Sequence, residues 1–358
     1  MELDKDLVLV KGRDGDYDPV WQDIVRGLNK TLSSNRDLEE KTDNDGVLSV
    51  NNDGFVVGAN TAGFQSDELN KSGKNYVTWC FKAGGNKGTF NKDGVAYASA
   101  AAAGLTAGTL TVTGSSVGTK QGFSIITYNG AGNNTNAATS PADSISHGLS
   151  QSPNFVITKR TNTTGDWVVR HPGVSTNYMI EFTAGAQQGP NYVYNATLPD
   201  ENFVYFGNNG QTNESGDSYI SYIWHDVPGL QKFGSFEGNN NADGTFVELG
   251  FRPAIIWVKG IDNNSRNWLV DDTERNKFNG RVNTSTFATN YSTLALNSSS
   301  AEPQSSAGTF EGNYIDHLSN GFKLRSTAAN SNASETYIYC AWAEAPMNNL
   351  YGAQSNAR

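Results

Sequence analysis

The sequence predicts an all-β protein built from three related antiparallel, sandwich-like units. Short runs of β-branched and aromatic residues alternate with turns rich in Gly, Asn, Ser and Thr, a pattern typical of many short strands. Two strand patterns then occur three times each, in the same order along the chain. The length of 358 residues also exceeds what one hydrophobic core normally serves, which favours more than one unit.

The first recurring pattern is an apolar strand that ends in a lysine. Residues 253–259 and 153–159 both run from a proline through mostly apolar positions to the lysine, and residues 6–11 show the same pattern without the proline. A polar turn and then a tryptophan follow each run, which predicts a hairpin. The tryptophans are Trp21, Trp167 and Trp268.

Because these tryptophans recur at corresponding places, we expect them in the core, where each unit must bury something. Two of them are followed by Asp-x-x-Arg, as Asp23 with Arg26 and Asp272 with Arg275. We expect each pair to be an ion pair that fixes the same loop in two units. A recurrent functional pair is the alternative, but no chemical motif accompanies either pair.

The second recurring pattern is a strand near the end of each unit. A tyrosine is followed by Val or Ile and has an aromatic residue five positions after it, starting from Tyr76, Tyr219 and Tyr337. Such residues have high β-propensity. The predicted boundaries are unit 1 at residues 1–83, a Gly- and Ala-rich linker or arm at 84–120, unit 2 at 121–229, unit 3 at 230–346 and a C-terminal tail at 347–358.

Unit 1 lacks the strand that opens the other two units. Residues 122–128 and 233–236 form an alternating strand before the lysine pattern, whereas unit 1 begins at Met1 already inside that pattern. We expect either a truncated chain or a neighbouring polypeptide that completes the sheet edge at residues 7–10 by strand addition.

One stretch of unit 1 has a helical period. The spacing of Ile24, Val25, Leu28 and Leu32 predicts at most a short helix within residues 23–34. Elsewhere we expect strands and turns.

The composition disfavours nucleic acids and membranes as partners. Charged residues make up 17% of the chain and the net charge is −10, so a basic nucleic-acid surface is not favoured. No apolar run approaches the roughly twenty residues that span a bilayer, and nothing resembles a signal peptide. We expect a soluble protein. Cys80 and Cys340 have opposite parity in their strands, so we expect two unrelated buried thiols and no disulfide.

Motifs of catalysis are missing from the sequence, so we expect no enzymatic activity and no cofactor. There is no phosphate-binding glycine loop, no paired-cysteine zinc spacing and no Gly-x-Ser-x-Gly elbow. The four histidines share no spacing, and we expect surface or loop positions for all of them. They are His147, His171, His225 and His317.

Residues 14–18 open like a calcium loop, with carboxylates at alternate positions. Pro19 stands where that loop needs a glycine, and Val25 stands where it needs a bidentate glutamate. We therefore expect no metal site.

Aromatic residues in loops are the remaining candidates for binding. Aromatic faces commonly stack on sugar rings, so a glycan-binding module is one interpretation of the chain. Exposed tryptophans would support it, and buried ones would weaken it. The loop tyrosines that we select are Tyr17, Tyr178, Tyr192 and Tyr291.

Several longer stretches resemble a family of virion-associated proteins from tailed bacteriophages, especially those of marine cyanobacteria and other marine bacteria. In the first part of the chain these are residues 73–85, 88–94, 97–101 and 116–126. Residues 234–239, 250–254, 320–325 and 337–343 extend the likeness to nearly the whole chain. The resemblance implies a tail-fibre-like or structural protein with a domain of unknown function. It transfers no catalytic or binding residue.

The resemblance and the residues together predict a structural protein of the virion, assembled in the host cytoplasm. A tail-fibre or tail-associated adhesin that contributes to host attachment is the first expectation. A capsid-decorating or fibre-anchoring protein is the alternative, and a glycan-binding module is the second alternative. The expected partners are other virion proteins, copies of the same chain with a trimer favoured, and a host-surface glycan or protein.

Overall fold

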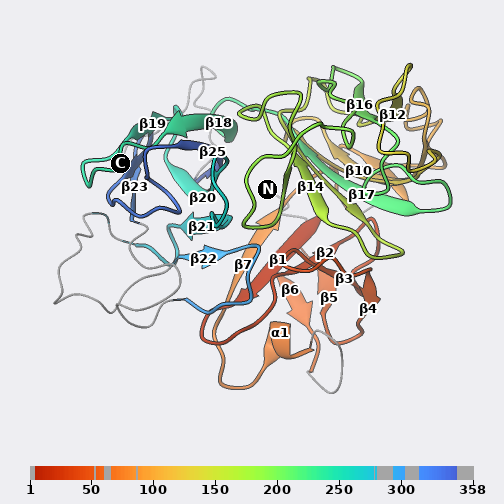
Figure 1. Ribbon diagram of the computed structural model, residues 1–358. Coiled ribbons are helices and arrows are strands. Elements are labelled where there is room, and N and C mark those ends of the chain that lie inside the picture. The colour runs from red at the N-terminus through yellow and green to blue at the C-terminus, as the bar shows by residue number, and fades with distance from the viewer. Residues whose placement is uncertain are drawn as a thin grey trace, which may run out of the picture.

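A computed structural model describes residues 5–51, 54–59, 66–85, 88–277, 279, 293–302 and 314–344. Over these residues the protein is almost entirely β-structure in several separate sheets, which confirms the predicted fold class. Three groups of sheets follow one another along the chain and lie side by side, coloured red to orange, yellow to green, and teal to blue in Figure 1. They form units 1, 2 and 3. The predicted tail at residues 347–358 lies outside the described residues.

The main sheet of every unit contains the same three neighbouring strands. The lysine pattern forms a strand that pairs antiparallel with the second strand of its hairpin on one side and with the strand of the tyrosine pattern on the other. We call them the lysine, hairpin and closing strands. The lysine strands are β1 (Leu7–Gly12), β13 (Phe155–Arg160) and β20 (Pro253–Gly260). The hairpin strands are β2 (Val20–Asp23), β14 (Trp167–Arg170) and β21 (Leu269–Asp272). The closing strands are β7 (Tyr76–Phe81), β17 (Ser218–Trp224) and β25 (Thr336–Ala343).

The pairing register is the same in the three units. Leu7 pairs with Phe81, Phe155 pairs with Trp224, and Ile255 pairs with Trp342. We call residues equivalent when they hold the same place in this pairing register.

Further strands extend each main sheet beyond these three. On the hairpin side they are β3 (Lys30–Ser33) and β4 (Lys41–Thr42) in unit 1, β15 (Ile180–Glu181) in unit 2 and β22 (Leu294–Ala295) in unit 3. On the other side, an opening strand pairs with the closing strand in units 2 and 3. The opening strands are β11 (Phe123–Asn129) and β18 (Gln231–Glu237).

Residues 84–120 are not the linker that their composition predicts. They contribute β8 (Phe90–Lys92), β9 (Val95–Tyr97) and β10 (Thr111–Gly118) to the sheet of unit 2. β10 pairs antiparallel with β11 and parallel with β8. Leu110, Val112 and Val117 are buried in the core of unit 2, so the few apolar side chains of this segment determine its place.

A smaller sheet covers the outer face of each main sheet. These sheets are β5 (Val47–Val50) with β6 (Phe55–Val57) in unit 1, β12 (Asp143–Ser146) with β16 (Phe203–Phe206) in unit 2, and β19 (Phe246–Glu248), β24 (Gly321–Leu324) and β23 (Ile315–Leu318) in unit 3. A separate apolar cluster lies between the two layers of each unit. Each unit is therefore a small sandwich with its own core.

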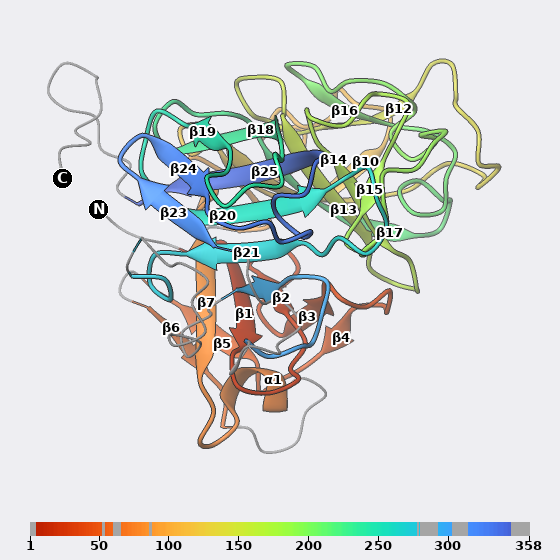
Figure 2. The same cartoon turned by 60° about the vertical axis from the view of Figure 1, so that its left-hand side comes forward.

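The inner faces of the three main sheets share one further core, around which Figure 2 shows the three units. Because side chains alternate along a strand, Val8 and Val10 face the small sheet of unit 1, whereas Leu7 and Leu9 enter the shared core. Its centre is aromatic. The ring of Trp21 lies 5.1 Å from that of Trp167 in unit 2 and 6.2 Å from that of Trp257 in unit 3.

No helix forms within residues 23–34. β2 ends at Asp23, whose carboxylate accepts hydrogen bonds from the backbone N–H groups of Val25 at 3.0 Å and Arg26 at 2.9 Å. This closes a turn before β3, so the spacing of the apolar residues comes from strand, turn and strand. Among the described residues, the single helix is α1 (Ser66–Asn70), and no helix is long and apolar enough to cross a bilayer.

The predicted open edge at residues 7–10 is wrong. β1 lies inside its sheet, paired with β2 on one side and β7 on the other. Within the described part of the chain, the end strands of this sheet are β4 and β7.

Candidate functional site

The two Asp–Arg pairs lie where the hairpin strands of units 1 and 3 end, and all four residues are largely buried. Arg26 Nε lies 2.6 Å from Asp23 Oδ2, and Arg275 Nε lies 2.6 Å from Asp272 Oδ2. Each arginine also donates to the carbonyl oxygen two residues before its aspartate, that of Trp21 at 3.1 Å and that of Val270 at 3.0 Å. The pairs therefore fix the same turn in both units.

A glutamate completes each pair to a triad. Arg26 Nη1 lies 3.3 Å from Glu40, and Arg275 Nη1 lies 2.7 Å from Glu302. Burial alone would lower the pKa of each arginine, but the carboxylates outweigh it and raise that pKa. Burial alone would raise the pKa of Asp272, but the Arg275 guanidinium outweighs it and holds that pKa below its usual value.

Both aspartates also contact the closing strand of another unit. Tyr222 of unit 2 donates its hydroxyl hydrogen to Asp23 at 2.9 Å. Trp79 of unit 1 donates its indole N–H to Asp272 of unit 3 at 3.0 Å. Tyr222 and Trp79 are equivalent, each three residues after the tyrosine of its strand. The triads therefore hold the junctions between units.

His171 takes the place of the aspartate in unit 2. Its Nδ1 accepts a hydrogen bond from the N–H of Gly173 at 3.1 Å, and its Nε2 lies 3.0 Å from the carbonyl oxygen of Tyr339 in unit 3. Burial lowers the pKa of His171 to about 3, so the imidazole is neutral at pH 7. A neutral ring thus spans the junction that lacks a triad.

The three equivalent lysines are fully buried at the same junctions. The ammonium groups of Lys11, Lys159 and Lys259 each donate to a carbonyl oxygen of a neighbouring unit, namely Ser299 at 2.7 Å, Asp37 at 3.3 Å and Gly185 at 2.6 Å. Burial lowers the pKa of Lys11 and Lys159 to about 8 and that of Lys259 to about 7. The lysine that marks each repeat is therefore a junction residue.

Backbone hydrogen bonds repeat the same relationship. In each junction a loop N–H donates to the carbonyl oxygen two residues after a lysine of the next unit. The pairs are Glu40 with Thr161 at 2.8 Å, Gln187 with Ile261 at 2.9 Å, and Glu302 with Arg13 at 2.8 Å. Unit 1 contacts unit 2, unit 2 contacts unit 3, and unit 3 contacts unit 1, so the three units close into a ring within one chain.

The tryptophans lie in the shared core, but not all at equivalent positions. Trp21, Trp167 and Trp268 are each at most 2% exposed, so none offers a surface platform for sugars. In units 2 and 3 the tryptophan stands opposite the lysine, because Lys159 pairs with Trp167 and Val258 pairs with Leu269. In unit 1 Val10 pairs with Val20, so the residue opposite the lysine is Pro19. Trp21 is therefore shifted by two residues.

The closing-strand tyrosines fix the loops that precede their strands. The hydroxyl oxygens of Tyr76, Tyr219 and Tyr337 accept hydrogen bonds from the N–H groups of Lys71 at 2.8 Å, Glu214 at 2.8 Å and Ala333 at 2.9 Å. Their recurrence in the sequence reflects this structural role.

The loop tyrosines do not form one site. Tyr17 is buried, with its ring 6.0 Å from that of Tyr76, and Tyr291 lies outside the described residues. Tyr178 is exposed and Tyr192 is half-buried, and Asn191 ties their loops together by donating to the carbonyl oxygen of Tyr178 at 3.1 Å.

The histidines are not on the surface, although His147, His171 and His225 lie in loops as expected and His317 lies in β23. All four are buried, and each has a ring nitrogen within 3.1 Å of a carbonyl oxygen. Cys80 is exposed rather than buried, whereas Cys340 is buried, and both are free thiols. Among the described residues no three His, Cys, Asp or Glu side chains are grouped to hold a metal ion. Asp14 instead accepts hydrogen bonds from Asn75.

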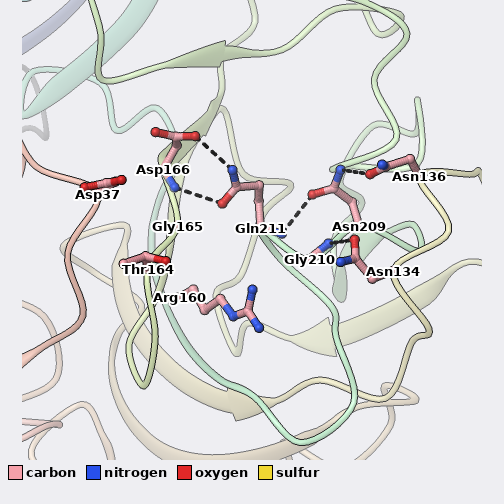
Figure 3. Close-up of a pocket in the computed structure, with 10 residues that line it drawn as sticks. All are labelled: Asp37, Asn134, Asn136, Arg160, Thr164, Gly165, Asp166, Asn209, Gly210 and Gln211. Carbon is pink, nitrogen blue, oxygen red and sulfur yellow. Dashed lines mark hydrogen bonds between the residues drawn. The ribbon is translucent and has the colours of Figure 1, made fainter.

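A polar cleft of about 340 Å³ lies where unit 1 meets unit 2 (Figure 3). Its walls come from the loop after β3 of unit 1, the β13–β14 turn and the loops before β12 and β17 of unit 2. The lining residues are Asp37, Asn134, Asn136, Arg160, Thr164, Gly165, Asp166, Asn209, Gly210 and Gln211. The N–H of Gly165 donates to the carbonyl oxygen of Asp37 at 2.7 Å, which joins the two units at the cleft.

Hydrogen bonds between the lining residues hold these loops in place. Gln211 donates to Asp166 at 2.9 Å and accepts from the Asp166 N–H at 2.8 Å. Asn209 donates to Asn136 at 2.8 Å, and Asn134 accepts from the N–H of Gly210 at 2.8 Å (Figure 3). The cleft thus presents amide, carboxylate and guanidinium groups, which can both donate to and accept from a hydroxyl-rich ligand.

A family model described as a domain of unknown function, DUF7483, matches residues 1–346. The chain belongs to this family. No curated protein and no solved structure matched the chain.

In this DUF7483 chain, the sequence pointed to the junction residues but not to the cleft. The lining residues come from segments more than 100 residues apart, such as Asp37 and Gln211, and most are Asn, Asp, Thr or Gly, which are also ordinary turn residues. The richness of the loops in asparagine was the one available signal.

Proposed function

We propose that this protein is a structural component of a virus particle, a tail fibre or tail-associated adhesin that contributes to host attachment. The likeness of short stretches between residues 73 and 126 and between residues 234 and 343 to virion-associated proteins of tailed bacteriophages supports this proposal. The ring of three sandwiches around one core also suits a protein that works outside the cell, because each junction is buried and hydrogen-bonded.

The polar cleft between units 1 and 2 carries the attachment part of the proposal. Its side chains are exposed or half-buried. Asn209 is hydrogen-bonded to Asn136 and Gln211 to Asp166, so these four side chains lose little conformational entropy when a ligand binds. Neighbouring hydroxyls of a sugar match the amide and carboxylate groups that line it. We therefore propose a surface polysaccharide of the host as the ligand.

A pair of matched variants tests the cleft. Thr164 is exposed and lines the cleft, whereas Thr106 is exposed elsewhere. Thr164→Arg fills the cleft and should weaken binding of the purified protein to host polysaccharide, measured by calorimetry, while Thr106→Arg should leave it unchanged. Equal binding by the two variants and the unaltered protein would contradict the glycan proposal.

Antibody labelling of intact particles tests the location. Label on the tail supports the adhesin, and label spread over the capsid supports the capsid-decorating alternative. Particles without label would contradict a virion protein of either kind.

The expected trimer stays a prediction. Because the three units already close a ring within one chain, the shared core needs no second copy. Light scattering coupled to size exclusion measures the mass directly. A trimer favours a fibre with its own symmetry, and a monomer favours a protein that assembles on a virion partner.

A further inference from the structure

The three closing strands differ in what lies on their outer side. β17 pairs with β11 from Phe123 opposite Trp224 to Asn129 opposite Ser218. β25 pairs with β18 from Gln231 opposite Trp342 to Glu237 opposite Thr336. β7 is equivalent to both, yet no strand of the described residues pairs with its outer side.

The backbone of β7 presents hydrogen-bonding groups at this edge. The N–H of Arg13 donates to the carbonyl oxygen of Asn75, so the odd-numbered residues of β7 point their backbone groups toward β1. In an antiparallel strand the groups of alternate residues point the other way. The N–H and C=O of Thr78 and Cys80 therefore face outward, as an edge strand offers them to an added strand.

Two apolar residues beside this edge are less covered than their equivalents. Val77 and Ile255 are only partly buried at the margin of the shared core. The equivalents of Val77 are Ile220 and Ile338, and those of Ile255 are Leu7 and Phe155. All four of these are 0% exposed.

The internal comparison explains this difference in cover. In unit 3 the opening strand places Phe233 against Phe155 of unit 2, with ring centroids 5.3 Å apart. By the ring order of the units, an opening strand on β7 would cover Ile255 of unit 3 in the same way. The exposure of Cys80 is also explained by the missing opening strand, because its equivalents Ile223 and Ala341, which have such a strand beside them, are buried.

We propose that β7 is an acceptor for an extended strand from another polypeptide, which adds antiparallel to it and completes the sheet of unit 1. The register of β11 and β18 defines the chemistry of that strand. An aromatic residue stands opposite the tyrosine in both units, as Tyr128 and Phe236 do. We expect a large apolar residue opposite Trp79 or Phe81. In unit 2, Ile125 and Phe123 of the opening strand stand opposite the equivalent residues of β17. In unit 3, Phe233 stands opposite the equivalent of Trp79 on β25.

The donor is a separate protein rather than a second copy. The strands of this type in the described residues are β11 and β18, and both already pair with a closing strand. A second copy would have to break one of these two pairings to donate β11 or β18. A partner with a spare extended segment loses no existing strand pairing when it binds.

A peptide with the sequence of residues 122–129 is the probe for this acceptor, used with the full chain. Its Phe–x–Ile–x–x–Tyr pattern should place the aromatic residue opposite Tyr76. Binding should slow hydrogen exchange at the amides of Thr78 and Cys80 by about tenfold or more at saturation, the protection expected of newly paired edge amides. Alkylation of the Cys80 thiol should slow as well, with buried Cys340 as the internal reference.

A second peptide of the same composition, with apolar and polar positions exchanged, is the control. It should leave both rates unchanged, because a strand shifted by one residue turns its apolar side chains to the wrong face. No protection by the first peptide would overturn the proposal. So would protection of Cys80 that rises with protein concentration in the absence of peptide, because that result identifies a second copy as the donor. Neither readout depends on glycan binding or on the presence of the protein in a virion.

Discussion

Trp79 in the first unit donates its indole N–H to Asp272 in the third, at 3.0 Å, across 193 residues of sequence. This bond connects the early part of the chain to the late part, and its counterpart between Tyr222 and Asp23 connects the second unit to the first. The stability of the ring should therefore depend on single side chains at the junctions.

Trp79→Phe tests this bond. The substitution keeps an aromatic ring in the shared core but leaves a buried carboxylate without one of its donors. Trp342→Phe is the matched control, since Trp342 is in the same core and its indole nitrogen is without a hydrogen-bond partner among the described residues. We expect Trp79→Phe to lower the free energy of unfolding by about 1.5–3 kcal/mol more than the control, the usual contribution of a hydrogen bond to a charged group. Urea unfolding measures the difference, and equal losses would contradict the role of the bond.

Arg275→Met tests the buried triad. Removal of the guanidinium leaves Asp272 and Glu302 close together without their shared cation. We expect a loss of about 3–5 kcal/mol in the free energy of unfolding, as for other buried ion pairs deprived of one partner. Lys41→Met removes the cation of an exposed pair with Glu39 and should leave the unfolding curve unchanged. If both variants unfold like the unaltered protein, the triad contributes no net stability.

Local patterns in the sequence were sufficient to predict the lysine and closing strands of each unit, because β-propensity and the position of turns are local properties. The lysine and closing strands were found in this way, from residues 6–11 to 337–342. The partners of their side chains were not predictable. Lys159 donates to Asp37 across 122 residues, and His171 contacts Tyr339 across 168, so only the folded sheets bring these groups together.

The errors have similar causes. Residues 84–120 looked like a linker because small residues dominate, yet Val112 and Val117 are buried in the core of unit 2. Ile24 and Leu28 have the spacing of a helix, but they lie in the connection between β2 and β3, which begins with a turn capped by Asp23. The cleft could not be predicted from the sequence, because its asparagines are also ordinary turn residues.

Lys259→Met should change how stability depends on pH. The pKa of Lys259 is lowered from 10.5 to about 7 by burial, so the unfolded chain holds more protons between these two values. Stability therefore rises with pH through this window, by at most about 1.4 kcal/mol per pH unit for one lysine. The variant should show a smaller rise in the free energy of unfolding between pH 7 and 9, where the tyrosines of the unfolded chain are still protonated. The carbonyl oxygens of Gly185, Gly260 and Arg266 would lose their shared donor, so the variant should also be less stable throughout. An unchanged pH dependence would mean that Lys259 keeps its proton in the fold.

His171→Asn should reduce the sensitivity of the fold to acid. Because burial lowers the pKa of His171 from 6.5 to about 3, its contribution is fully present above pH 6.5 and is lost as the pH falls toward 3. His147, with a pKa lowered to about 4, adds a loss of the same sign, whereas Asp6, whose pKa burial raises to about 6, acts in the opposite direction. These two groups are common to both proteins, so the difference between variant and unaltered protein isolates His171. We expect the melting temperature of the variant to fall less between pH 7 and pH 4.5. Equal falls would show that the junction between units 2 and 3 admits a charged imidazole.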